Sequence, residues 1–126
     1  MRTSEVRVFD DIDLELIDIL RNLNLSRNVA STLVFLSNVD EATSIVLEVG
    51  SQLRQPEVSI AIKELKNLGW VDEREITKVG RGRPMKVYKL VVSMGEIIEH
   101  LEKQTKENTQ CMVKTIEKLK MLKFKK

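Results

Sequence analysis

Hydrophobic residues recur at helical spacing in the first two segments of the chain. In the first segment, acidic residues from Asp10 onward favour a helix N-terminus, and the positions predicted to face inward are Ile12, Leu16, Ile19, Leu20 and Leu23. The second segment follows Ser26, a residue type that caps helices, and is expected to bury Ala30, Leu33 and Val34 before it ends near Asn38. Two consecutive amphipathic helices are therefore expected.

A pair of helices separated by a short turn is predicted next. The first begins near Thr43 or Ser44 and is expected to end at Gly50, because glycine readily adopts the left-handed conformation that terminates helices. After a three-residue turn, the second runs from about Gln55 to Gly69, with Pro56 in its first turn, where the missing N–H is not needed. Its inner face is expected to consist of Val58, Ala61, Ile62, Leu65 and Leu68.

Two short strands joined by a glycine-rich turn are predicted after these helices. Partial alternation of apolar and polar residues indicates a strand over residues 70–76, and a segment rich in Val, Tyr and Leu indicates another over residues 85–92. The segment between them contains Gly80 and Gly82, which suit a turn. The predicted order is therefore helix, turn, helix and β-hairpin.

The last segment is predicted to form one long helix that ends near Leu122. Ser93 and Glu96 at its start have the spacing of a capping box. Steps of three and four residues connect eight positions, which is typical of a coiled-coil seam: Ile98, Leu101, Thr105, Asn108, Met112, Thr115, Leu119 and Leu122. We expect two chains to pair along this seam, and the alternative, because its middle is polar, is a helix that packs on its own domain.

The expected fold is mainly α with a small β-hairpin. It comprises a winged helix-turn-helix domain over residues 1–92 and a C-terminal coiled-coil dimerisation helix with a basic tail over residues 93–126. In such a domain the second helix of the pair enters the major groove of DNA and the hairpin forms a wing. The side chains outside the apolar stripe of that helix are the candidates for base contacts: Arg54, Gln55, Glu57, Ser59, Ile60 and Lys63. Gln55 suits an adenine edge, and Ile60 suits a thymine methyl group.

The predicted wing, residues 77–86, has a strong bias of charge. Between Thr77 and Leu90 the chain has five basic residues and no acidic one. Glycines in the turn would let the backbone approach DNA while arginines reach phosphates or a narrow minor groove. The wing candidates for DNA contact are therefore Lys78, Arg81, Gly82, Arg83 and Lys86.

Charge is distributed unevenly along the chain, although the formal net charge is only +2. Residues 1–53 carry four basic and nine acidic side chains, whereas residues 54–126 carry seventeen basic and ten acidic ones. A polyanion responds to local clusters of charge rather than to the net charge. We therefore expect double-stranded DNA to bind to the second half of the chain.

Three segments resemble parts of a known family of DNA-binding domains. Residues 53–71, LRQPEVSIAIKELKNLGWV, resemble the recognition helix of archaeal winged-helix transcriptional regulators, and residues 25–30, LSRNVA, are similar to the opening of TrmB-type domains. Residues 80–84 with Lys86 and Tyr88 resemble the wing of these regulators. The resemblance implies sequence-specific DNA binding by a dimer. Gln52 and Ile60 depart from the family, which often has Gly at the first position and Arg or Lys at the second.

Other functional classes find less support in the sequence. The only histidine is His100 and the only cysteine is Cys111, so one chain assembles neither a Cys/His zinc site nor a Cys-His nucleophile pair, and no enzyme activity, cofactor or metal is expected. No apolar run approaches the roughly 20 residues of a membrane span, and Met1 is followed by polar residues, which predicts a cytoplasmic protein. The competing interpretation is a winged-helix adaptor that binds protein in a transcription complex, which Glu57 and Glu64 on the exposed helix face would suit.

Overall fold

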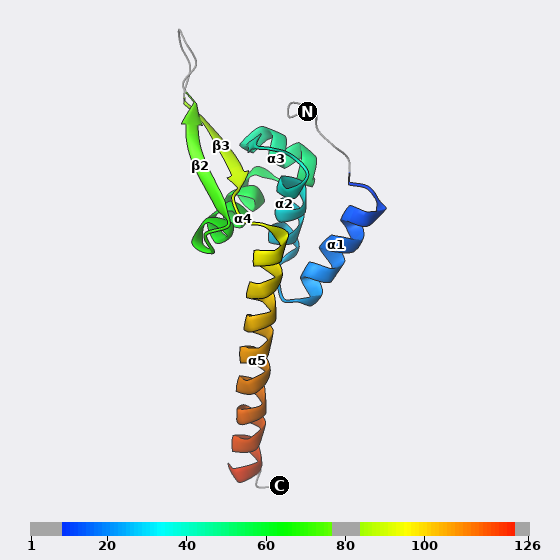
Figure 1. Ribbon diagram of the computed structural model, residues 1–126, viewed down its shortest axis with the longest axis vertical. Helices are drawn as coiled ribbons and strands as arrows, with labels where there is room; N and C mark the ends of the chain where they lie inside the picture. Colours follow the sequence, from blue (N-terminus) through cyan, green and yellow to red (C-terminus); the bar gives the residue numbers. More distant parts are fainter. Residues whose placement is uncertain (1–8, 77–83, 123–126) are drawn as a thin grey trace. The chain divides into compact units, whose positions relative to one another are not determined.

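A computed structural model describes residues 9–76 and 84–122, and these residues form five helices and three strands. In chain order they are α1 (Asp11–Asn22), α2 (Arg27–Ser37), β1 (Ala42–Thr43), α3 (Ser44–Ser51), α4 (Gln55–Asn67), β2 (Val71–Ile76), β3 (Met85–Leu90) and α5 (Met94–Leu122) (Figure 1). The chain divides into two units, one ending at Val92 and the other beginning at Ser93. The predicted fold class, mainly helical with a small hairpin and a long C-terminal helix, is confirmed.

Helix α2 forms the centre of the first unit. Every residue from Val29 to Leu36 is buried, and the helix packs against α1, α3 and α4 (Figure 1). Ser26 caps it as predicted, since its Oγ accepts a hydrogen bond of 3.2 Å from the N–H of Val29. The residues predicted to face inward are buried at Ala30, Leu33, Val34, Val58, Ala61, Ile62 and Leu65, whereas Leu68, the C-cap of α4, is half-buried. The amphipathic pattern expected for the second helix is wrong over residues 29–36, because α2 is buried there on all sides.

The inner face predicted for α1 is partly wrong. Ile12 and Ile19 are 68% and 47% exposed, whereas Asp13 and Ile17 are buried. Asp13 tolerates burial because its carboxylate accepts hydrogen bonds of 3.1 Å each from the N–H of Asp10 and from Nδ2 of Asn38. Helix α1 therefore has apolar side chains on two faces, and the first unit covers only one of them.

Helix α3 does not end at Gly50, as the sequence predicted, but continues to Ser51. Its C-cap is Gln52, which has a left-handed backbone with φ 59° and ψ 41°. Gly50 lies inside the helix for a different reason, because a Cβ at this position would overlap the ring of Phe35 on α2. The missing side chain lets α2 and α3 approach closely.

The sheet has the strand order β1-β3-β2 and is antiparallel throughout. The hairpin strands pair from Val71 opposite Leu90 to Ile76 opposite Met85. Strand β1, which the sequence analysis did not predict, adds two residues along the other edge of β3. The rings of Trp70 and Tyr88 are buried at the base of this hairpin.

The second unit consists of α5. Its capping box is confirmed, because the N–H of Glu96 donates to Ser93 Oγ at 3.2 Å and the N–H of Ser93 donates to Glu96 Oε1 at 3.4 Å. The helix extends to Leu122, the last residue that the structure describes. Ile97 and Leu101 are buried, whereas all residues from 102 to 122 are exposed. Within the described residues, no helix is long and apolar enough to cross a membrane.

Candidate nucleic-acid interface

Helix α4 turns one face into the core and the opposite face outward. Four of the six candidate side chains on the outer face are exposed within the helix: Gln55, Ser59, Ile60 and Lys63. Ile60 exposes 58% of its surface among polar neighbours. The structure therefore places a mixed polar and apolar surface on α4, as direct contact with base edges requires.

The remaining two candidates lie at the start of α4. Arg54 is the exposed N-cap residue, and its N–H donates a hydrogen bond of 2.9 Å to Oε1 of Glu57. This bond satisfies a backbone donor that has no partner within the helix. Glu57 is half-exposed, and its hydrogen bond to the N–H of Arg54 helps to start the helix.

A hydrogen bond links two of the candidate base readers. Nε2 of Gln55 donates to Oγ of Ser59 at 3.0 Å, one helical turn later. The bond fixes the direction of both side chains on the outer face of α4. A change at either residue therefore affects the other.

The wing candidates lie mostly outside the described residues. Lys78, Arg81, Gly82 and Arg83 lie outside the described residues. Lys86 is exposed on β3, and Lys89, on the same strand, is also exposed. Lys86 shares a face of the hairpin with Glu73 and Tyr88, toward α4, whereas Lys89 lies on the opposite face with Arg74 and Val87.

An ion-pair network that the sequence analysis missed joins α4 to the hairpin. Oε1 of Glu73 on β2 lies 2.9 Å from Nζ of Lys66, and Oε2 of the same carboxylate lies 3.5 Å from Nζ of Lys86. The hydrogen bond from Lys66 holds the pKa of Glu73 below its ordinary value, and the same bond raises the pKa of Lys66. No sequence pattern indicates this contact, because it crosses from a helix to a strand.

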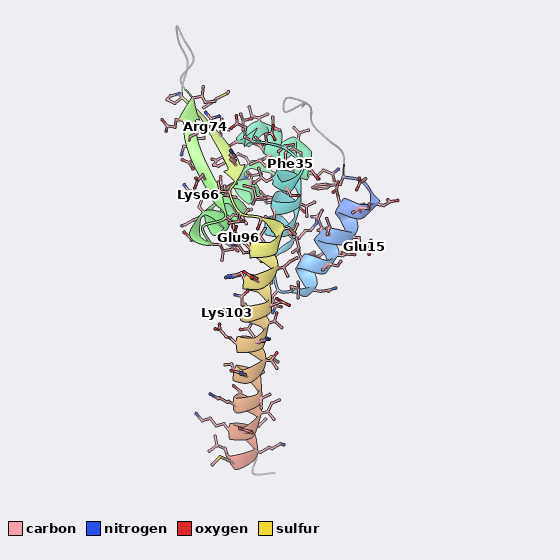
Figure 2. All side chains as sticks on the ribbon, in the orientation of Figure 1. Glu15, Phe35, Lys66, Arg74, Glu96 and Lys103 are labelled. Carbon is pink, nitrogen blue, oxygen red and sulfur yellow. The ribbon has the colours of Figure 1, made fainter. Side chains whose placement is uncertain are left out.

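A second ion pair lies on the other side of the hairpin. Nη2 of Arg74 on β2 lies 2.6 and 2.7 Å from the two carboxylate oxygens of Glu41, which precedes β1. The partners are 33 positions apart along the chain. Figure 2 shows Lys66 on α4 and Arg74 on β2 as parts of different elements of the first unit.

A shallow cleft separates α4 from the hairpin. Its volume is about 250 Å³, and its lining includes Ser59, Lys63 and Lys66 from the helix with Glu73 and Tyr88 from the strands. Two lysines and one carboxylate give this lining a positive balance of charge. Among the described residues, no group of His, Cys, Asp or Glu side chains is arranged to hold a metal ion.

The chain is similar to known proteins in structure but not detectably in sequence. No protein-family model matches the chain, and the comparison with curated proteins gives no match. A possible transcriptional regulator from Methanosarcina mazei Go1 has a similar structure with a TM-score of 0.62 and 17% sequence identity, over 83% of this chain and 87% of that chain.

Two further similar structures are MarR-family transcription regulators. The one from Silicibacter pomeroyi has a TM-score of 0.51 and 18% identity, over 85% of this chain and 78% of its own. The other has a TM-score of 0.50 and 16% identity, over 89% and 78% of the two chains. At these identities the likeness shows a shared fold, the winged helix of transcription regulators.

Proposed function

We propose that this chain is a transcription regulator that binds double-stranded DNA sequence-specifically and is not an enzyme. The observation that carries the proposal is the outer face of α4, which presents Gln55, Ser59, Ile60 and Lys63 beside a hairpin with exposed lysines. In this proposal, α4 lies in the major groove and the hairpin, including residues 77–83, contacts the backbone or the minor groove. The winged-helix fold of its structural neighbours supports the assignment.

The resemblance of residues 53–71 to archaeal recognition helices supports a TrmB-like DNA-binding domain as the closer subtype. Gln52 fits this assignment, because its left-handed backbone is the conformation that Gly adopts most readily. The competing protein adaptor loses part of its support, because Glu57 caps α4.

We further propose a homodimer, formed through the seam positions of α5 other than Leu101, which is buried within the single chain. The seam positions Ile98, Met112, Leu119 and Leu122 are 49%, 65%, 49% and 71% exposed. A single helix does not keep so long an apolar stripe in water without a partner. A two-fold dimer would set two α4 helices on one duplex, so the operator would be an inverted repeat with half-sites roughly 10 base pairs, or a multiple, apart.

The experiment that tests DNA binding selects bound duplexes from a random library and measures their affinity against salt concentration. We expect log affinity to fall linearly with log salt, and Arg81→Ala with Arg83→Ala to flatten the slope by roughly one unit for each phosphate that is no longer neutralised. Lys103→Ala with Lys106→Ala removes the same charge from α5 and is the matched control. Equal effects of the two double variants, or no enrichment of any sequence, would contradict the proposal.

A second pair of variants separates base contacts from backbone contacts. Gln55→Ala and Ser59→Ala are expected to lower discrimination between the selected operator and random DNA, since each base contact contributes about 1 to 3 kcal/mol. Gln104→Ala, on exposed α5, is the control for the loss of an exposed amide. A uniform loss of affinity for all duplexes would assign Gln55 and Ser59 to the backbone instead.

A further inference from the structure

Adjacent residues of β2 connect the hairpin to the helix-turn-helix from opposite faces of the sheet. Successive side chains of a strand point to opposite faces, so Glu73 and Arg74 extend away from each other. Each has a charged partner outside the hairpin, Lys66 on α4 for Glu73 and Glu41 before β1 for Arg74. The hairpin is therefore held between two ion pairs.

The contact of Arg74 spans the width of the sheet. Arg74 lies opposite Val87 on the middle strand, and Val87 lies in turn opposite Thr43 on β1. The guanidinium thus reaches past the middle strand to the carboxylate of Glu41. Contact with both carboxylate oxygens restricts the orientation of the pair more than a single contact would.

The contact of Glu73 joins three elements. Its two oxygens face different lysines, Lys66 of α4 and Lys86 of β3, and its side chain is only 21% exposed. Without this carboxylate, the two lysines would repel each other across the cleft. Glu73 therefore keeps two positive side chains close together at the junction of α4 and the hairpin.

We infer that Glu41 and Glu73 are positioning residues of the DNA interface, which set the direction of the hairpin relative to α4. The inference rests on the proposed function. Strand β1 pairs with β3 through only two residues, so the hairpin is held to the rest of its unit mainly by the buried side chains of Trp70, Val71, Val87 and Tyr88 and by these ion pairs. Exposed ion pairs contribute little to global stability, so the role inferred for these pairs is geometric. A correctly directed hairpin lets the wing and α4 contact one duplex together.

Replacing the carboxylate of Glu73 tests the inference, because a positioning role and simple electrostatics predict opposite changes in affinity for the operator. Glu73→Gln removes a negative charge beside DNA, so electrostatics alone predicts tighter binding to every duplex. A positioning role predicts about three- to tenfold weaker binding to the selected operator, in the range of coupling between contacting residues, with random DNA bound equally or more tightly. Tighter binding to the operator would overturn the inference for Glu73.

Charge-matched variants test Glu41 and Arg74. Glu41→Arg with Arg74→Glu reverses the pair, and Glu41→Gln with Arg74→Gln abolishes it, while both keep the net charge of the natural chain. We expect the reversed pair to bind the operator more tightly than the uncharged pair and than either single reversal. Equal operator affinity of the reversed and the uncharged pair would overturn the role of Glu41.

A measurement without DNA separates this inference from the proposed function. Residual dipolar couplings of the backbone amides of α4, β2 and β3 report the direction of the hairpin relative to the helix. We expect one alignment to fit all three elements in the natural chain, and the couplings of β2 and β3 to depart from it in Glu73→Gln and in the uncharged Glu41 and Arg74 pair. Unchanged couplings would overturn the inference whether or not the chain binds DNA. Changed couplings in a chain that binds no duplex would support the positioning role and contradict the proposed function.

Discussion

The ring of Phe35 occupies the space in which a side chain at Gly50 would begin. Phe35 is fully buried on α2 and is surrounded by core residues, so it cannot move aside without opening a cavity. Gly50→Ala is therefore expected to destabilise the fold by about 1 to 3 kcal/mol, the usual cost of overpacking. Chemical denaturation measures this change as a lower free energy of unfolding.

The matched control for this substitution is Gly95→Ala, near the start of α5. A Cβ there would meet only Ser93 Oγ, at 3.7 Å, which is ordinary van der Waals contact. Alanine favours a helix over glycine by up to about 1 kcal/mol, so this variant is expected to be as stable as the natural chain or more stable. Equal stability of the Gly50→Ala and Gly95→Ala variants would show that Phe35 relaxes without cost.

At Gln52, which has a left-handed backbone, a substitution is expected to raise the free energy of unfolding rather than lower it. Its φ of 59° suits glycine better than glutamine, which is strained in this region. Gln52→Gly is expected to raise the free energy of unfolding by about 0.5 to 1 kcal/mol, after the larger conformational freedom of glycine in the unfolded chain is included. Asn24→Gly is the control, because Asn24 has φ 75° but asparagine tolerates that conformation. A gain at Asn24 as large as that at Gln52 would contradict this account.

The pH dependence of the contact between Glu73 and Lys66 can be predicted from the directions in which the two pKa values are shifted. The pKa of Glu73 is lowered from 4.5 in the folded chain, so the stabilisation is present above that value and is lost as the pH falls through the lower, folded pKa. The pKa of Lys66 is raised from 10.5, so its contribution is present below 10.5 and is lost as the pH rises through the folded value. In Lys66→Gln, an NMR titration is expected to show the pKa of Glu73 moving up toward 4.5. No movement, or the same movement in Lys103→Gln, would show that Lys66 is not the cause.

The proposed dimer predicts different effects for two neighbouring residues of α5. Leu119 lies on the seam, whereas Met121 is 82% exposed on another side of the helix. Leu119→Lys is expected to yield monomers at concentrations where the natural chain is dimeric, because a lysine at a seam position is costly. Met121→Lys is expected to leave the dimer intact in sedimentation. A chain ending at Val92 is expected to be monomeric, and a dimer of that shortened chain would assign the interface to the first unit.

The parts of the fold that follow from local rules could be predicted from the sequence. The buried face of α4 follows from a single apolar stripe, and the caps at Ser26 and Ser93 follow from residue type and spacing. Periodicity did not show that α2 is buried on all sides, because that depends on three helices packing around it. Helix α1 was harder to predict because it has two apolar stripes, and periodicity alone does not show which one faces the core of its own domain. Local spacing also suggested Gly50 as the helix end, although Phe35, distant in sequence, determines its role.

The non-local parts of the site could not be predicted in the same way. Strand β1 has two residues, too few for periodicity to be visible, and it exists because β3 offers an unpaired edge. The Glu41 and Arg74 pair depends on that arrangement of strands. The outer face of α4 was predictable because it is the complement of a buried stripe. The bond between Gln55 and Ser59 was not predicted, although their spacing of four residues on a helix makes the two side chains neighbours.

That hydrogen bond has a consequence for the entropy of DNA binding. Ordering a flexible side chain at an interface costs about 0.5 to 1.5 kcal/mol, and Ser59 already orders Gln55 before DNA arrives. The bond engages one of the two Nε2 hydrogens, and an adenine edge needs the other hydrogen together with Oε1. In the proposed complex Ser59 thus contributes to affinity in addition to any base contact of its own, because Gln55 loses less conformational freedom when it binds.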